Sequence, residues 1–155
     1  MFGSNIKIHP ADKYFSLLIR ERDKWTCVRC GRKHEERKMT LDTSHFFTRG
    51  KKSTRFDFEN CDSLCKLPCH LGKNSMDSTQ FGWEYQKGIE GFRGVIQNGS
   101  YTQFKINQLG RKRFDDLMVR ANTPVKVDFN LMADIFKKEL KKHELIKKSL
   151  IFGAR

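Results

Sequence analysis

The sequence predicts an α+β fold in which a short ββα unit, framed by cysteines, lies between an N-terminal helix and a mainly helical C-terminal region. Two cysteine pairs, Cys27–Cys30 and Cys65–Cys69, enclose residues with the composition of short strands. Apolar side chains recur at helical spacing before the first pair and again in the last third of the chain. These observations give both the fold class and the order of its elements.

The composition indicates one domain with a small core. The chain has 155 residues, of which 37% are hydrophobic and 32% charged, so an additional cross-link between distant segments would help it to fold. We expect a single domain, 1–155, made of an N-terminal helix (12–26), a cysteine-framed core (27–77) and a mainly helical, basic region (78–155).

The charge of the chain favours a polyanionic partner. A formal net charge of +13 attracts nucleic acid or an anionic membrane surface, and nucleic acid is the stronger expectation. No run of eighteen apolar residues is present, and Met1–Lys13 has no apolar segment, so we expect neither a membrane span nor a signal peptide. A cytoplasmic protein is expected, in which thiols stay reduced and cysteines are more often metal ligands than disulfides.

The first half of the chain alternates helical and extended patterns. Residues 12–24 predict an amphipathic helix whose basic face we expect to be solvated rather than in contact with DNA. Residues 39–47 predict a first strand, 55–58 a second strand, and 49–55 a basic loop between them. A helix is expected to begin near Pro68 and to complete the ββα unit.

The second half is mainly helical. Residues 78–100 carry scattered glycines and predict irregular structure. Helices are expected at 101–109, ending at Gly110, and at 111–120; Asp128 should cap a long helix that extends to about residue 150. The apolar stripe of this last helix comprises Leu131, Met132, Ile135, Phe136 and Leu140. Its many lysines are interpreted as a solvated face rather than a DNA-binding one.

The two cysteine pairs predict a structural zinc site. Four thiolates at about 2.3 Å from one tetrahedral Zn²⁺ require paired ligands on tight turns, and both spacings are within the usual range. We therefore expect Cys27, Cys30, Cys65 and Cys69 to hold one zinc ion. The alternative is four ordinary buried cysteines. Cys61 falls outside the pairing and is expected to be a small strand or core residue.

Three polar residues lie in a characteristic order within this frame. His45 and Asn60 stand between the cysteine pairs, and His70 follows the last cysteine directly. This order resembles the HNH, or ββα-metal, nucleases, including the four-cysteine version of phage endonuclease VII. The resemblance implies that Asn60 holds the His45 strand in place.

A closer resemblance covers most of the chain. It rests on Phe15-Ser16, Ile19-Arg20, Arg22-Asp23, Cys27-x-x-Cys30-Gly31, Ser44-His45-Phe46, Arg49, Arg55-Phe56-Asp57, Glu59-Asn60, Gly72-Lys73-Asn74 and Leu109-Gly110. These motifs resemble the NinG (Rap) recombination proteins of lambdoid bacteriophages. The resemblance implies a phage-encoded endonuclease in the host cytoplasm that acts in DNA recombination on branched intermediates such as Holliday junctions and D-loops.

The chemistry of the two histidines fits that activity. His45 would be the general base, because an imidazole with a pKa near neutrality can take a proton from the attacking water. His70 would bind a catalytic Mg²⁺ or Mn²⁺ ion at the scissile phosphate. The alternatives are a strand histidine satisfied by backbone groups at position 45 and a residue near the zinc, or an alternative zinc ligand, at position 70.

The second ligand of the catalytic metal is the weak point of the pattern. Many HNH enzymes have Asp or His directly before the general base, whereas this chain has Ser44. Asp42 is the nearest upstream carboxylate and a candidate ligand, although strand alternation sets it on the face opposite to His45. Asp57 and Asp62 are further candidates.

Four basic residues follow His45 and are candidate DNA contacts: Arg49, Lys51, Lys52 and Arg55. Their side chains suit phosphate contacts that position a backbone without reading its sequence, and a solvated loop is the alternative. The expected partner is DNA, and branched DNA in particular. A symmetric junction needs two cuts, and a homodimer, for which the long C-terminal helix is a candidate interface, would supply two sites. A non-catalytic zinc-binding DNA module and an HNH nicking endonuclease acting on duplex DNA are the competing functions.

Overall fold

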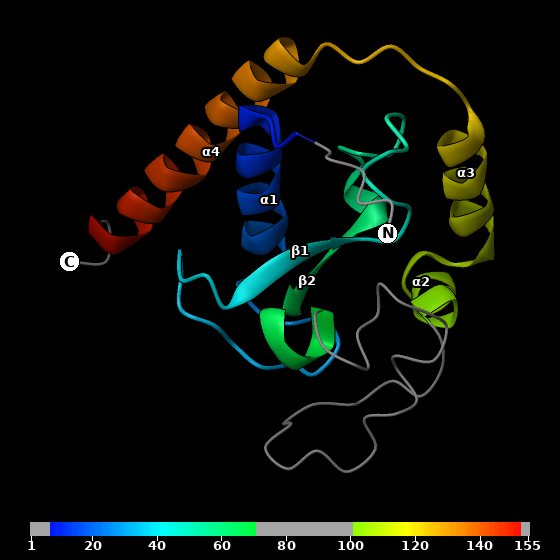
Figure 1. Ribbon diagram of the computed structural model, residues 1–155. Helices are drawn as coiled ribbons and strands as arrows, with labels where there is room; N and C mark the ends of the chain where they lie inside the picture. Colours follow the sequence, from blue (N-terminus) through cyan, green and yellow to red (C-terminus); the bar gives the residue numbers. More distant parts are fainter. Residues whose placement is uncertain (1–6, 71–100, 153–155) are drawn as a thin grey trace.

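The computed structural model describes residues 7–70 and 101–152 and contains a small two-stranded sheet among helices, compatible with the α+β class (Figure 1). The expected irregular segment 78–100, and the part of the helix expected after His70, lie outside the described residues. Within the described ranges, no helix is both long and apolar enough to cross a membrane.

Helix α1 (Pro10–Arg22) begins two residues earlier than predicted, because the side chains of His9 and Asp12 together cap its first turn. The imidazole Nδ1 of His9 accepts a hydrogen bond from the Ala11 amide at 3.2 Å, and the Asp12 carboxylate accepts one from the His9 amide at 2.8 Å. Such reciprocal caps satisfy amide groups that have no partner within the helix. Its buried side chains are Ala11, Phe15, Leu18 and Ile19.

The sheet consists of β1 (Leu41–His45) and β2 (Cys61–Cys65), which pair antiparallel. Leu41 stands opposite Cys65, and His45 stands opposite Cys61. The first strand lies inside the predicted range 39–47. The register places Cys65 at one end of the sheet and His45 at the other.

The second strand was predicted at 55–58, and that prediction is wrong. Residues 58–60 form a short 3-10 turn, η1 (Phe58–Asn60), which begins where the Asp57 carboxylate accepts a hydrogen bond from the Glu59 amide at 2.9 Å. The phenylalanine at position 58 packs edge-on against Phe15 of α1, with ring centroids 5.0 Å apart. The apolar side chain of Phe58, which suggested a strand, therefore packs against α1 instead.

A single π-helical turn, η2 (Lys66–His70), follows β2 where a helix was predicted to start near Pro68. Its Leu67 has extended backbone angles, φ −130° and ψ 136°, so the turn is kinked. This turn carries Cys69 and His70 on consecutive positions.

The C-terminal helices agree closely with the predicted ranges. They are α2 (Tyr101–Leu109), α3 (Arg111–Asn122) and α4 (Phe129–Phe152). Gly110 separates the first two with φ 77°, a conformation that favours glycine. The carboxylate of Asp128 accepts hydrogen bonds from the amides of the residues two and three positions on, both at 3.0 Å, and is the predicted cap of α4.

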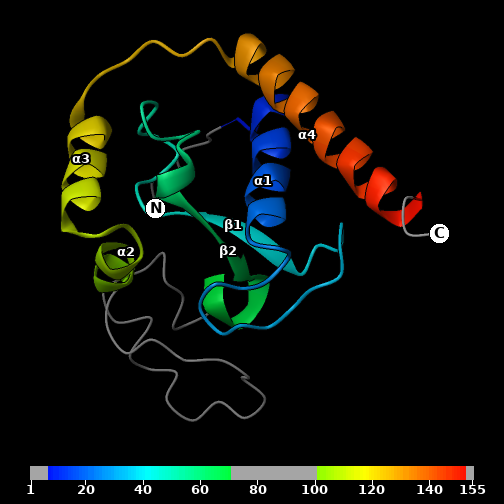
Figure 2. The same ribbon diagram turned by 180° about the vertical axis from the view of Figure 1, so that it is seen from behind.

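Helix α4 lies along α1, and α2 and α3 lie on the other side of the hairpin (Figures 1 and 2). Phe136 of α4 packs on Phe15, with centroids 5.2 Å apart. The predicted stripe is only partly correct, because Leu131 and Ile135 are 55% and 47% exposed. The contact with α1 instead uses Met132, Phe136 and Leu140, together with Ala133.

A buried ion pair attaches α2 to β2, and partly exposed ion pairs attach α3 to the segment before β2. The carboxylate of Asp62 is buried and lies 2.7 Å from the Lys105 ammonium, and it accepts a hydrogen bond from the Tyr101 hydroxyl at 2.7 Å. On α3, Arg120 reaches Asp57 at 2.8 Å and Glu59 at 2.6 Å. These contacts fix the helical region against the end of the hairpin.

Candidate functional site

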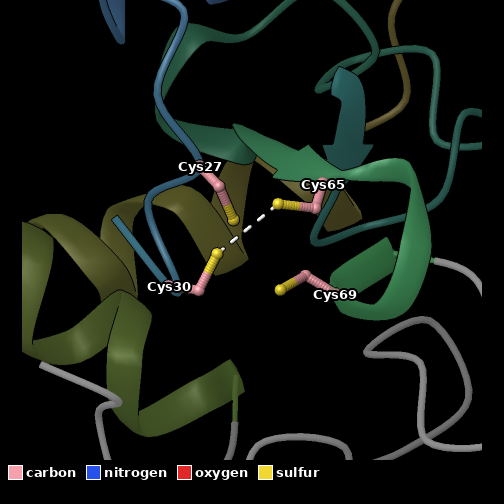
Figure 3. Close-up of side chains that lie close together, drawn as sticks. All are labelled: Cys27, Cys30, Cys65 and Cys69. Carbon is pink, nitrogen blue, oxygen red and sulfur yellow. Dashed lines mark hydrogen bonds between the residues drawn. The ribbon is translucent and has the colours of Figure 1, made fainter. Parts of the chain in front are cut away.

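The four paired cysteines converge as the sequence predicts. Cys27, Cys30, Cys65 and Cys69 are all buried, and their sulfur atoms lie within 4.8 Å of one another (Figure 3). The sulfurs of Cys30 and Cys65 are 3.4 Å apart. Because zinc–thiolate bonds of about 2.3 Å imply sulfur–sulfur edges of about 3.8 Å in a tetrahedron, this group could hold a metal ion such as zinc.

Two tight turns bring the cysteine pairs together. After Cys27 the chain reverses at Gly31, which has φ 71° and whose amide donates to the Cys27 carbonyl at 2.9 Å. Cys65 ends β2, and Cys69 lies in η2, so the second pair depends on the end of the sheet. Hydrogen bonds from the three neighbouring thiols lower the pKa of Cys27, which favours a thiolate there and hence metal binding.

Cys61 is separate from this group, as predicted. It is fully buried in β2, and burial, followed by the negative charge of Asp62, raises the pKa of its thiol. A protonated thiol in the core behaves as a small apolar side chain.

A histidine that sequence reasoning did not consider lies beside the cysteine group. The Nε2 atom of His34 is 3.1 Å from the sulfur of Cys65, and its Nδ1 is 2.9 Å from the Thr40 hydroxyl. With Cys65 as a thiolate, Nε2–H donates to the sulfur and Nδ1 accepts from the hydroxyl. The spacing to the first cysteine pair was a signal that could have identified it, because His34 follows Cys30 by only four residues.

A second site is formed by a cleft of about 340 Å³ between α1, the hairpin and η2. Its lining includes three of the residues singled out from the sequence: Asp42, His45 and His70. Arg49 from the loop after β1 also lines it, as do Asp12, Lys13, Ser16 and Arg20 from α1. The cleft therefore brings together imidazole, carboxylate and guanidinium groups from four segments of the chain.

His45 is held in one tautomer. Its Nε2 lies 3.1 Å from the backbone carbonyl of Arg55. Because a carbonyl oxygen can only accept, Nε2 carries the proton and Nδ1 keeps its lone pair. Burial, with a further contribution from the positive charge of Arg49, lowers the pKa of His45 to about 4. The imidazole is thus neutral at physiological pH, whereas the sequence had suggested a value near neutrality.

Asn60 fastens the segment that follows His45. Its Oδ1 accepts a hydrogen bond from the Phe47 amide at 2.7 Å, and its Nδ2 donates to the carbonyls of Phe47 and Thr54, both at 2.9 Å. The side chain is fully buried, so these bonds satisfy groups that have no access to water. The expected bracing role of Asn60 thus corresponds to three hydrogen bonds across the β1–β2 connection.

Asp42 and His70 meet at the cleft. The Nδ1 atom of His70 is 2.9 Å from Oδ2 of Asp42. Burial tends to raise the pKa of Asp42, but the hydrogen bond and charge of His70 outweigh it and lower the pKa. Adjacent ligands of an octahedral Mg²⁺ at about 2.1 Å are about 3 Å apart, so the two atoms are suitably spaced for a divalent ion that would replace the proton between them.

Asp42 and His45 line the same cleft, although strand alternation predicts that they lie on opposite faces of β1. Ser44 is fully buried, while Asp42 and His45, three positions apart, line the same cleft. Asp42 stands near the start of β1, opposite Leu64 and next to η2, where the partner histidine approaches it. The cleft extends along the strand and receives both side chains.

The other two carboxylate candidates do not lie in the lining of this cleft. Asp57 caps η1 and pairs with Arg120 at 2.8 Å. Asp62 is buried against Tyr101 and Lys105. Both carboxylates are committed to packing the helical region, so they are excluded as ligands of an ion at His70.

The four candidate DNA contacts separate into three groups. Arg49 lines the cleft with His45, whereas Lys51 and Lys52 line a second hollow, of about 260 Å³, beside the end of α3. Arg55 is 6% exposed and forms a two-point ion pair with Asp12, at 2.6 and 2.8 Å. The prediction of a DNA contact at Arg55 is therefore corrected: this guanidinium anchors the connecting loop to α1.

Comparisons with known proteins identified no protein similar to this chain. A scan against protein-family models, a search of curated proteins and a search of solved structures each returned no match to this chain. The candidate site therefore rests on the geometry of its own residues.

Proposed function

We propose that this protein is a metal-dependent DNA endonuclease of the HNH type that hydrolyses phosphodiester bonds in branched recombination intermediates. The observation that supports this best is the common cleft of Asp42, His45 and His70. A zinc ion at the four cysteines would brace η2, which carries both Cys69 and His70, and Asn60 fastens the connection after His45. The order of His45, Asn60 and His70 resembles the HNH nucleases, and the longer set of motifs from Phe15-Ser16 to Leu109-Gly110 resembles the NinG (Rap) proteins of phages.

His45 is the proposed general base. Its Nε2 donates to the Arg55 carbonyl, which leaves the Nδ1 lone pair to accept a proton from water. The pKa of about 4 keeps this nitrogen unprotonated before substrate binds, and the negative charge of a nearby phosphate would raise the pKa toward the range of an effective base. Reduced affinity for a proton in the free protein is thus compatible with the proposed role.

Asp42 and His70 are the proposed ligands of a catalytic Mg²⁺ or Mn²⁺ ion. A carboxylate oxygen and an imidazole nitrogen lie 2.9 Å apart at the cleft, and both types of atom bind such ions. The bound ion would neutralise charge on the phosphate and assist the departing 3′-oxygen. Ser44, which is buried, takes no part in this ligand set.

DNA is the proposed substrate because of charge. The net charge of +13 attracts a phosphate backbone, and Arg49 contributes one cation within the cleft. Lys51 and Lys52, in the adjacent hollow, extend the basic surface along the loop. Contacts of this kind position a backbone without reading bases, which supports selectivity for structure over sequence.

The deciding experiment compares cleavage of a four-way junction, a D-loop and a linear duplex with Mg²⁺ or Mn²⁺. The His45→Ala variant should keep its zinc and its DNA affinity and lose cleavage. His143→Ala, which removes an imidazole that is 45% exposed on α4, is the matched control and should cut normally.

Each other outcome favours a different function. DNA binding without cleavage of any substrate would favour a non-catalytic zinc-binding module. Equal cleavage of linear duplex would favour a nicking endonuclease, and retained cleavage by His45→Ala would exclude His45 as the base.

A further inference from the structure

Arg20 of α1 has a defined orientation in the cleft. Its Nη2 donates a hydrogen bond to the Ser16 hydroxyl at 2.8 Å, one helical turn earlier. The same hydroxyl lies 3.1 Å from the Thr43 hydroxyl of β1. The guanidinium carbon is 5.9 Å from the centroid of the Trp25 ring. Helix, strand and aromatic ring together hold the guanidinium in place.

This arginine differs from others near the hairpin because it has no carboxylate partner. Within the described part of the chain, Arg22 pairs with Asp23 and Arg55 with Asp12, whereas no carboxylate lies within 4.0 Å of Arg20. Its Nε is buried and has no hydrogen-bond partner among the described residues. A guanidinium with an unused buried donor is suited to an anion from outside the protein.

The carboxylates that line the cleft already have other partners. Asp12 receives two hydrogen bonds from Arg55, and Asp42 receives one from His70. Among the described residues, neither Arg20 nor Arg49 forms an ion pair with these carboxylates, although the charge of Asp42 acts on Arg20 at longer range. Burial lowers the pKa of Arg20, with an opposing effect of Asp42, but an arginine remains charged in proteins.

We propose that Arg20 is the phosphate ligand of this cleft: its guanidinium, oriented by Ser16, binds a non-bridging oxygen of the phosphodiester that Asp42, His70 and His45 act on. The proposal rests on the proposed function. The planar guanidinium has parallel N–H donors that match the oxygens of a phosphate. A fixed positive charge at this point would also stabilise the additional charge of the transition state.

The cleft geometry gives the phosphate partners on two sides. Arg20 comes from α1, whereas Asp42 and His70 come from β1 and η2. Because the Ser16–Thr43 contact joins α1 to β1, the two walls are held at a fixed separation. The phosphate thus enters a preformed site.

DNA binding tests the proposal without requiring cleavage. In a His45→Ala background, the affinity for a four-way junction is measured by fluorescence anisotropy over a series of salt concentrations. Arg20→Gln should weaken binding and reduce the magnitude of the salt slope by about 0.9, the value for one lost phosphate contact. Arg111→Gln, which removes an exposed arginine on α3, should leave the slope unchanged.

Two further measurements separate a phosphate ligand from a structural counter-charge of Asp42. Arg20→Gln should retain the zinc content and the melting temperature, and it should bind Mn²⁺ at least as well as the parent, because a nearby positive charge has been removed. Arg20→Lys should restore the salt slope, since one charge is enough for a phosphate contact. In a chain that keeps His45, the Arg20→Lys variant should cut DNA more slowly than the parent, because lysine lacks the paired N–H donors of a guanidinium.

An unchanged salt slope in Arg20→Gln, or an equal reduction in Arg111→Gln, would overturn the proposal. So would weakened Mn²⁺ binding in Arg20→Gln. Failure of the proposed nuclease function would be seen separately, as the absence of cleavage by the protein that carries His45. The binding data would still decide whether Arg20 contacts a phosphate.

Discussion

The Nε2 atom of His45 donates a hydrogen bond to the backbone carbonyl of Arg55 at 3.1 Å. The guanidinium of the same Arg55 is bound to Asp12 of α1, so the carbonyl that selects the tautomer of His45 belongs to an anchored residue. The tautomer of a strand histidine is thereby determined by a helix that precedes it in the sequence by thirty residues or so.

The first prediction concerns the pKa of His45. Burial and Arg49 lower it to about 4, against about 6.5 for a histidine in an unfolded chain. NMR titration of the imidazole resonances, assigned by their loss in His45→Ala, should give a pKa well below 6.5. A midpoint of 6 or above for His45 would contradict the burial argument.

The same shift predicts the direction in which stability depends on pH. Between pH 4 and 6.5 the unfolded state binds more protons at His45 than the folded state does. The free energy of unfolding therefore increases with pH over this range and reaches its full value, as far as His45 is concerned, above pH 6.5. The difference between the pKa values of the folded and unfolded states corresponds to roughly 3 kcal/mol of stability lost as the pH falls to 4. Urea unfolding of the parent and His45→Ala at pH 5 and 7 should show a smaller difference between the two pH values in the variant.

The second prediction concerns Asn60. Removing its side chain takes away the hydrogen bonds of the Phe47 amide and carbonyl, whereas the Thr54 carbonyl keeps the bond that it accepts from the Asp57 amide at 3.2 Å. Because each unsatisfied buried group costs about 1–3 kcal/mol, Asn60→Ala should destabilise the fold by several kcal/mol in urea unfolding. Asn60→Asp keeps the acceptor for the Phe47 amide and loses both donors.

The Asp variant should also be destabilised, because a carboxylate would face two carbonyl oxygens. Asn122→Ala is the comparison, since that asparagine is exposed and bonds only the Lys51 ammonium and the Met118 carbonyl. Equal stability of Asn60→Ala and Asn122→Ala would show that the β1–β2 connection does not depend on Asn60.

The third prediction concerns the divalent ion. Asp42→Asn removes the charge of one proposed ligand with little change in shape, and it should weaken Mn²⁺ binding by at least tenfold in calorimetry. Asp57→Asn is the matched control, because Asp57 pairs with Arg120 away from the cleft. Zinc content should be unchanged in both variants. Equal Mn²⁺ affinity in the two would exclude Asp42 as a ligand.

The fourth prediction concerns the cysteine group and His34. Cys27→Ser should abolish tight zinc binding, whereas Cys61→Ala should keep one zinc per chain, because Cys61 lies outside the cluster. His34→Ala removes the donor 3.1 Å from the Cys65 sulfur and should lower zinc affinity by about 10–100-fold, the usual effect of a residue that supports a ligand.

Competition with a chromophoric chelator measures these affinities. His9→Ala provides a control for the loss of an imidazole, because His9 caps α1 and has no contact with the cysteines. Wild-type zinc affinity in His34→Ala would mean that the hydrogen bond to Cys65 contributes nothing to the metal site.

Much of the fold could be predicted because its signals are local. The helical periodicity of the C-terminal region, the cap at Asp128 and the break at Gly110 depend on neighbouring residues alone. The strand at Cys61–Cys65 was missed because its Asp62 and Ser63 have little strand character by themselves. They become a strand through pairing with β1 and burial beneath α2.

The site divides in the same way. Cys27, Cys30, Cys65 and Cys69 could be assigned from type and spacing, because two cysteine pairs at these spacings are typical of a metal site. The roles of the basic residues could not, because Arg20, Arg49 and Arg55 are chemically identical and differ only in their neighbours. A helical spacing of four from Asp12 through Ser16 to Arg20 was present in the sequence, but its direction toward the cleft was not.

Local periodicity and ligand chemistry depend on residue type and spacing, so the helices, the cysteine group and the candidates His45, Asn60 and His70 could be predicted from the chain alone. Three features become visible only in the folded structure. Asp42 meets His70, Arg55 pairs with Asp12, and Nε of Arg20 has no hydrogen-bond partner among the described residues. The physical reason is that a charged group is defined by its partners, and partners distant in the chain are chosen by packing.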